Sequence, residues 1–125
     1  VDFISIHIYP VWEGKRIAEA IDVSINQYNQ INELYQNKQV IISETGWPTT
    51  SSPNSILPEI ANEHNQLIFN STIKTWTEKH QITCFFFEAF DEPWKGSNEK
   101  NDPEKHWGFY FENRRPKLIM KKIQH

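Results

Sequence analysis

The stretch QVIISETGWPTT, residues 39–50, joins a short apolar run to a carboxylate, a glycine, a tryptophan and a proline. Its first part, with Val40, Ile41 and Ile42 in a row, is typical of a short strand that is buried on both faces. A carboxylate is costly inside such a strand, because burial removes its hydration. Glu44 is therefore expected where the strand ends and the chain leaves the core.

The same succession, an apolar run and then polar or aromatic residues, occurs three times in the chain. VDFISIHIY at residues 1–9 and ITCFFFEAF at residues 82–90 are the two other apolar runs. Between the runs, apolar residues recur at helical spacing over residues 15–38 and 58–80. Strands that alternate with helices predict a parallel sheet covered by helices, with the carboxyl ends of its strands at one rim.

Two α/β architectures have this arrangement, an open doubly wound sheet and a (β/α)8 barrel. An open sheet would ordinarily carry a glycine-rich phosphate loop, and the 4 glycines of the chain form no such pattern. A barrel needs eight units and about 250 residues. The 125 residues are therefore interpreted as one domain, residues 1–125, that is an incomplete barrel. Because Val1 already lies in an expected strand, we expect missing polypeptide upstream and unpaired strand edges here.

Charge and composition exclude several classes of partner. The formal net charge is −3 and no block of lysine and arginine occurs, so neither nucleic acid nor an anionic membrane surface is expected. No run approaches the roughly 18 apolar residues of a membrane span. The basic residues near the end are interpreted as the solvated face of a terminal helix: Arg114, Arg115, Lys117, Lys121 and Lys122.

Cysteine and histidine give no sign of a metal site. The single cysteine, Cys84, lies in an apolar run and is predicted to be a small buried hydrophobe. His7 alternates with Ile6 and Ile8, which favours a hydrogen bond on the inner side of the sheet. No metal and no cofactor are predicted, because the remaining histidines lack ligand spacing: His64, His80, His106 and His125.

The segment SETGWPT, residues 43–49, resembles the signature of glycoside hydrolase family 17, the β-1,3-glucanases and related glucan transferases. HIYPVW at residues 7–12 and FEAFDEPWK at residues 87–95 are similar, in order and spacing, to the ends of the family's sixth and eighth barrel strands. KHWGFY at residues 105–110 resembles its last loop. The resemblance implies that this chain is the last three βα units of a (β/α)8 TIM barrel.

The resemblance also implies roles for three charged residues. Glu44 corresponds to the catalytic nucleophile, and Glu92 and Lys95 have supporting roles, with Glu92 accepting sugar hydroxyls or holding Lys95 beside the nucleophile. The family's general acid/base lies on the fourth strand, upstream of Val1. Two alternatives remain: Glu44 as a buried cap of the next helix, and Glu92 with Lys95 as a structural ion pair.

Aromatic residues at the strand ends are candidates for binding a sugar. Tyr9 and Trp47 are expected to face the sugar, where flat rings stack on pyranose faces. Trp12 and Trp94 either do the same or pin their loops. Glu13, Glu88 and Asp91 are further rim carboxylates, and Glu88, whether it is catalytic or hydrogen-bonded inside the barrel, needs a partner.

The sequence thus predicts the C-terminal part of a retaining β-glucan hydrolase or transglycosylase, acting on glucan that is β-1,3-linked by the family resemblance. Without its acid/base the chain alone is expected to be inactive. The alternative is a non-catalytic half-barrel that binds glucan or pairs with another polypeptide, including a second copy of itself. The expected partners are a β-glucan and the missing N-terminal part of the barrel. The resemblance is compatible with an extracellular, periplasmic or cell-wall location.

Overall fold

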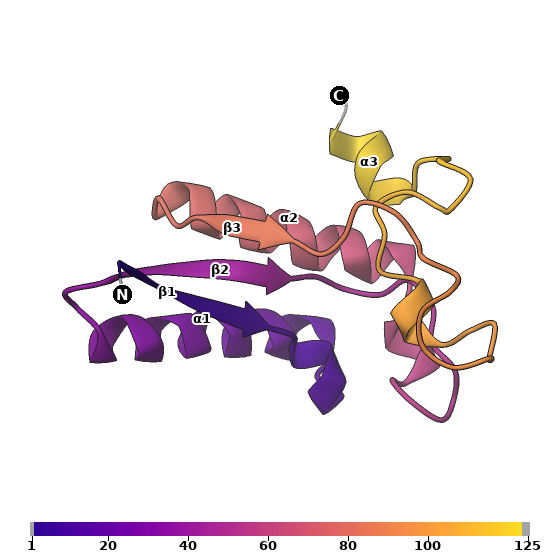
Figure 1. Ribbon diagram of the computed structural model, residues 1–125, viewed down its shortest axis with the longest axis horizontal. Coiled ribbons are helices and arrows are strands. Elements are labelled where there is room, and N and C mark those ends of the chain that lie inside the picture. The colour runs from indigo at the N-terminus through magenta and orange to yellow at the C-terminus, as the bar shows by residue number, and fades with distance from the viewer. Residues whose placement is uncertain (1, 124–125) are drawn as a thin grey trace.

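A computed structural model describes residues 2–123 of the chain. Three strands alternate with helices along the chain (Figure 1). The strands are β1 (Phe3–Ile8), β2 (Gln39–Thr45) and β3 (Cys84–Phe86), and the α-helices are α1 (Ile17–Leu34), α2 (Glu63–Lys79) and α3 (Leu118–Ile123). Three short 3-10 helices lie in the connections: η1 (Pro10–Glu13), η2 (Pro58–Ile60) and η3 (Pro103–Lys105).

The three strands form one parallel sheet in the order β1-β2-β3. Their carboxyl ends lie on the same side, where the long connections gather (Figure 1). The register of β1 against β2 slips once, so that Ile6 lies opposite Ile42 but His7 lies opposite Glu44. This irregularity sets the position of Glu44 beside the end of β1. The predicted parallel α/β arrangement is confirmed for these three strands.

The two long helices cover one face of the sheet. Tyr28 of α1 packs in a buried cluster with Ile8, Val40 and Ile42 of the strands. Phe69 of α2 and its neighbours form a second buried cluster beneath the strand ends. Each fully buried side chain of this size contributes about 1.5–3 kcal/mol relative to an exposed one. These two clusters hold the strand ends, and with them the rim, in a fixed arrangement.

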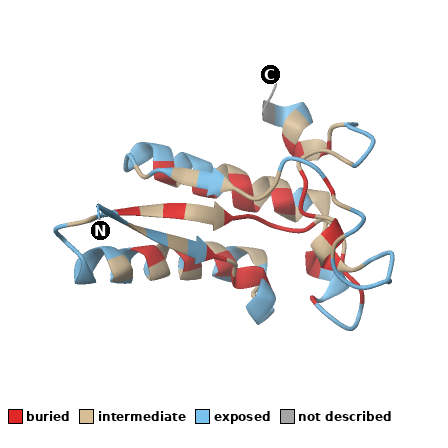
Figure 2. Cartoon of the chain, viewed as in Figure 1, coloured by how far each residue is buried: buried red, intermediate tan, exposed pale blue. Residues whose placement is uncertain are grey.

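The opposite face of the sheet and the free edge of β1 are open in the described residues. Phe3 is 48% exposed and Phe85 is 59% exposed, while Ile4 packs toward the helices. Figure 2 shows exposed positions along β1 and β3. Because side chains alternate between the faces of a strand, Phe3 and Phe85 belong to the side away from α1 and α2. In the strand order, β1 is an edge strand with no partner on its outer side within residues 2–123, so the expected unpaired edge is present.

Two further predictions concern Cys84 and membrane spans. Cys84 is partly buried among apolar neighbours, and burial raises the pKa of its thiol to about 12, in agreement with a hydrophobic role. Within residues 2–123, no helix combines the length and the apolar character that crossing a bilayer demands.

Candidate active site

Glu44 lies at the end of β2 with its carboxylate turned toward β1. The Tyr9 hydroxyl donates a hydrogen bond of 2.5 Å to Glu44 Oε2. His7 Nδ1 lies 3.6 Å from the same oxygen. The Glu44 side chain keeps 38% of its surface exposed, so it is not a buried cap of the following helix. The carboxylate is held by groups from the neighbouring strand and remains open to a ligand.

Tyr9 is the group that fixes this carboxylate. Burial raises the pKa of its phenol, and the adjacent Glu44 carboxylate raises it further, because ionisation would place two negative charges together. The phenol therefore remains a hydrogen-bond donor over the whole neutral range. The Tyr9 ring also packs edge-on against Phe87 at 6.3 Å, which connects β1 to the chain that follows β3.

A second charged group follows β3 and is centred on Lys95. Lys95 Nζ lies 3.3 Å from Glu88 Oε1, contacts Glu92 Oε2, and stands 4.6 Å above the centre of the Phe87 ring. The expected ion pair between Glu92 and Lys95 is thus formed, and Glu88 has the partner that its burial requires. Neither contact excludes the supporting role that the resemblance gives Glu92 and Lys95.

The pKa values of this group reflect burial and crowding. Burial raises the pKa of Glu88 to about 7; Lys95 acts against this rise and the nearby Glu92 adds to it. For Lys95, burial lowers the pKa, but the hydrogen bond to Glu92 and the charge of Glu88 outweigh it, so that the net pKa is raised. Lys95 is accordingly a permanent cation between two carboxyl groups.

Trp107 connects the two charged groups, and sequence reasoning did not single it out. Its ring contacts Tyr9 at 5.2 Å, Trp12 at 5.9 Å and Phe87 at 6.1 Å between centres. Trp107 itself is almost fully buried. Its partners lie far away in the sequence, so no local pattern could have identified this role. Trp12 covers one side of Trp107 and keeps 44% of its own surface exposed, which leaves it available to a ligand.

Trp47 does not line this site, and the prediction that it faces a sugar is wrong. Its side chain has no exposed surface, its Nε1 donates to the Ile60 carbonyl at 2.7 Å, and its ring packs on Phe69 at 5.2 Å. At the preceding Gly46, a Cβ would stand 2.2 Å from the Phe87 carbonyl oxygen. Only glycine permits this close approach between the chain after β2 and the chain after β3.

Asp91 and Lys117 also differ from the sequence interpretation. Asp91 is not an open rim carboxylate, because it is buried and bound by Lys117 Nζ at 2.7 Å and by the Gly108 amide at 2.9 Å. His106 Nδ1 lies 3.7 Å from its other oxygen. Burial alone would raise the pKa of Asp91, but His106, Lys117 and Gly108 together lower it. Lys117, expected on a solvated helix face, has no exposed surface.

Residues 1–108 match the BtgE/BtgC glycoside hydrolase domain. The chain belongs to this glycoside hydrolase family. A glucan 1,3-beta-glucosidase of Arthroderma benhamiae is 28% identical over 94% of this chain and 42% of its own length. The glycoside hydrolase family 17 beta-1,3-glucanosyltransferase of Rhizomucor miehei has a TM-score of 0.82 and 29% identity over 95% of this chain. The resemblance to family 17 is confirmed.

The BtgE/BtgC glycoside hydrolase domain match covers nearly all of the candidate site. An active-site mutant of the Rhizomucor miehei enzyme in complex with laminaritriose has a TM-score of 0.82 and 28% identity to this chain, over 95% of this chain and 42% of the enzyme. The chain spans 42% of the length of both the Arthroderma benhamiae relative and the Rhizomucor miehei transferase. Glu44, Tyr9, Lys95 and Trp107 all lie within the matched residues 1–108, whereas Lys117 lies beyond them.

Proposed function

We propose that this chain carries the nucleophile of a retaining β-glucan hydrolase or transglycosylase, and that the nucleophile is Glu44. The chain is, on this proposal, the last three βα units of a (β/α)8 barrel. The parallel order β1-β2-β3 and the match to part of a family 17 transferase support this assignment. In such barrels the catalytic residues stand at the carboxyl ends of strands, which is the position of Glu44.

The contact between Tyr9 and Glu44 is the observation that carries the proposal. Retaining enzymes use one carboxylate to attack the anomeric carbon and form a glycosyl ester, which water or a sugar hydroxyl then releases. Tyr9 holds Oε2 of Glu44, whereas Oε1 has no hydrogen bond or ion pair within residues 2–123. One oxygen is thus fixed and the other is free to attack, which is the arrangement that a nucleophile needs.

The substrate we propose is a β-1,3-linked glucan. The relatives named as 1,3-beta-glucosidase and 1,3-glucanosyltransferase, and the laminaritriose complex of the latter, support this linkage. Trp12 offers an exposed ring for stacking on a pyranose, and Tyr9 borders the reacting centre. Lys95 is held by Glu92 and lies over the Phe87 ring. Its ammonium group would donate hydrogen bonds to sugar hydroxyls.

The general acid is the component that this proposal places outside the chain. Retention requires a second carboxyl group about 5–5.5 Å from the nucleophile. Lys95 contacts both Glu88 and Glu92, which commits these two carboxyl groups to the charged group beside the Phe87 ring. We therefore propose that the acid/base lies upstream of residue 1, as the family resemblance implies.

A non-catalytic role remains the second candidate, and the open face of the sheet favours it. Phe3 and Phe85 present apolar surface on that face, which suits association with another polypeptide. In this alternative the half-barrel binds glucan through Trp12 and Tyr9 without reacting with it. The two candidates differ in one testable property, the reactivity of Glu44.

Covalent labelling tests that property without requiring an acid. A 2-fluoro glucoside with a dinitrophenol leaving group needs little protonation, so a competent nucleophile forms a stable ester that mass spectrometry locates. We expect slow labelling of Glu44, none in Glu44→Gln, and labelling slowed roughly 10- to 100-fold in Tyr9→Phe, since a hydrogen bond to a charged group is lost. Tyr35→Phe, at an exposed tyrosine of the α1 end, is the matched control. Absence of any label, with the fold intact, would favour the non-catalytic candidate.

A further inference from the structure

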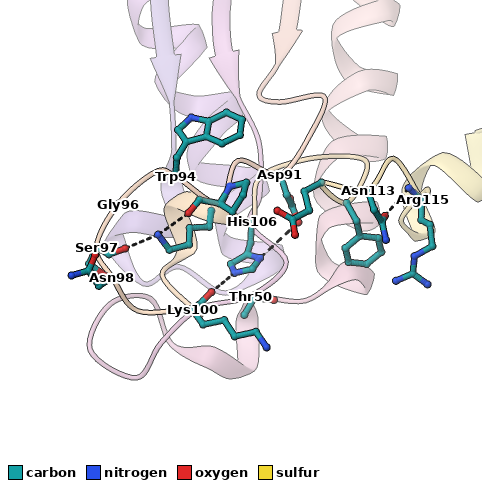
Figure 3. Close-up of a pocket in the computed structure, with 14 residues that line it drawn as sticks. Thr50, Asp91, Trp94, Gly96, Ser97, Asn98, Lys100, His106, Asn113 and Arg115 are labelled. Atoms are coloured by element: carbon teal, nitrogen blue, oxygen red, sulfur yellow. Dashed lines mark hydrogen bonds and ion pairs between the residues drawn. The ribbon is translucent and has the colours of Figure 1, made fainter.

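A pocket lies in the loops that follow β3, the first of which also carries Glu92 and Lys95 of the candidate active site. Its volume is about 670 Å³, and it is enclosed by residues 93–106 on one side and by the turn at residues 111–115 on the other (Figure 3). Glu44, Tyr9 and Trp107 are not among the residues that line it. The pocket is therefore distinct from the surface around the nucleophile.

The loop that forms one wall is held in a single shape by buried charge. Lys105 is nearly buried, and its ammonium donates to the carbonyls of Pro93 at 3.2 Å, Ser97 at 2.5 Å and Lys95. The Asp102 carboxylate accepts the amide of Ser97 at 2.8 Å and that of Glu104 at 2.9 Å. A loop ordered before binding loses little conformational freedom when a ligand arrives, so this wall is suited to recognition.

This ordered loop displays an indole in solvent. Trp94 is 76% exposed, and Figure 3 shows it at the margin of the pocket rather than packed into the loop. Exposing so large an apolar surface is unfavourable, and nothing in residues 2–123 covers it. A flat ring held on a fixed loop is the usual platform for the apolar face of a sugar ring.

Polar side chains and charged side chains of both signs line the pocket. The pocket is lined by the Asn98 amide, the Lys100 ammonium, the Glu112 carboxylate and the Arg115 guanidinium, which lies over the Phe111 ring. None of these four side chains has a hydrogen bond or ion pair within residues 2–123. The Asp91 charge is neutralised by Lys117, and the Lys105 ammonium is occupied by the loop carbonyls. Mixed, uncommitted donors and acceptors fit a neutral ligand with many hydroxyls better than an anion such as phosphate.

The chain connects this pocket to the active site. Trp94 lies between Glu92 and Lys95, whose side chains form the charged group beside Phe87. We propose that the pocket is an accessory glucan subsite, in which Trp94 stacks on a sugar of the same β-glucan chain that reaches Glu44. The proposal rests on the proposed function, because it takes its ligand from there. Short oligosaccharides would occupy the active site alone, and longer ones would also contact Trp94.

Nuclear magnetic resonance of the 15N-labelled 125-residue chain tests this directly. The indole N–H signals of Trp94 and Trp12 report on the pocket and on the active site, and the variants Trp94→Phe and Trp12→Phe assign them. We expect laminarihexaose to shift both signals and laminaribiose to shift only that of Trp12. We also expect Trp94→Ala to weaken laminarihexaose binding about 3- to 10-fold, with laminaribiose binding unchanged. Leu34→Ala, at an exposed side chain of α1, is the control and should bind both sugars normally.

The possible outcomes distinguish a failure of the subsite proposal from a failure of the proposed function on which it rests. A shift of Trp12 by laminarihexaose with no shift of Trp94 would overturn the subsite and leave the proposed function standing. A shift of Trp94 without one of Trp12 would overturn the accessory role, because the sugar would then bind at the pocket without reaching the active site, and it would also count against the sugar contact proposed for Trp12. If neither signal moves at millimolar sugar, both proposals fail. Equal affinity of Trp94→Ala and Leu34→Ala for laminarihexaose would also overturn the subsite.

Discussion

Lys117 Nζ lies 2.7 Å from Asp91 Oδ1 in a place where the lysine has no exposed surface. The same ammonium donates to Thr49 Oγ1 at 2.8 Å. One cation thus joins the chain after β2, the chain after β3 and the start of α3. Burial lowers the pKa of Lys117, and Asp91 opposes that change. The Lys117 ammonium and the Asp91 carboxylate stabilise each other's charged form, so removing either one should be costly.

Lys117→Met is expected to destabilise the fold by about 3–5 kcal/mol, because it leaves the Asp91 carboxylate buried without its cation. Urea denaturation measures the loss. Asp91→Asn combined with Lys117→Met should cost less than the sum of the two single variants, since the unpaired charge is then absent. Lys122→Met changes an exposed lysine of α3 and should stay within about 0.5 kcal/mol of the parent. A cost for Lys117→Met as small as that of the control would refute the buried pair.

The raised pKa of Glu88 predicts that this carboxyl group stabilises the fold at low pH and not at high pH, which is unusual for a carboxyl group. Burial raises its pKa from 4.5 to about 7, so the folded chain holds this proton more tightly than the unfolded chain does. The contribution is fully present below pH 4.5 and is lost as the pH rises through 7. Thermal unfolding between pH 4.5 and 8 should show the parent losing stability relative to Glu88→Gln. A constant difference between the two across this range would contradict the raised pKa.

Substitutions of Trp47 and Trp12 should have different effects, one mainly on the stability of the fold and the other mainly on sugar binding. Trp47→Ala removes a fully buried ring and its hydrogen bond to Ile60, so we expect a loss of about 3–5 kcal/mol. Trp12→Ala removes a half-exposed ring and should cost about 1 kcal/mol or less, yet weaken laminarihexaose binding. Chemical denaturation and calorimetric titration give the two quantities. Trp76→Ala, at a partly buried ring of α2, is the control for binding.

The strands, the long helices and the position of Glu44 at the end of β2 could be predicted from the sequence, because each depends on local pattern. Apolar runs marked β1 and β2, and a charged residue at the end of a buried run can lie only at the rim. The third strand is shorter than its apolar run, since only Cys84–Phe86 has a partner in β2. A run of apolar residues indicates that a segment is buried, but the hydrogen bonds to a neighbouring strand decide where the strand ends.

The errors concern side chains whose surroundings come from distant parts of the chain. Trp47 shares its motif with Glu44, but its ring is buried against Phe69 of α2 and donates a hydrogen bond to the Ile60 carbonyl. Lys117 looks like one of several exposed lysines, and only the position of Asp91, 26 residues away, makes it a buried cation. Contacts across such separations leave no trace in composition or periodicity. They require the fold before they can be seen.

The open face of the sheet predicts association of the isolated chain. Phe3 and Phe85 lie on that face, and the outer edge of β1 has no paired strand within residues 2–123. We expect self-association above micromolar concentration and binding of hydrophobic dyes, both reduced in a Phe3→Lys, Phe85→Lys variant. Leu34→Lys, at an apolar residue of α1 that is even more exposed than Phe3 and Phe85, should leave association unchanged. If light scattering finds a monomer and fluorescence finds no dye binding, this face does not mediate association.

The proposed function also predicts how this chain acts on a β-1,3-glucan polymer. Without an acid to protonate the leaving sugar, a nucleophile loses typically 10²- to 10⁴-fold in rate, before any loss from an incomplete cleft. We therefore expect no measurable release of sugar from laminarin by the 125-residue chain, as measured by reducing-end assay. Addition of an upstream segment bearing the proposed acid, fused or in trans, should restore turnover, and Glu44→Gln in the restored protein should abolish it. If the chain alone cleaves laminarin at an ordinary enzymatic rate and Glu44→Gln is inactive, then Glu88 or Glu92 is the acid. The placement of the acid upstream of residue 1 would then be wrong.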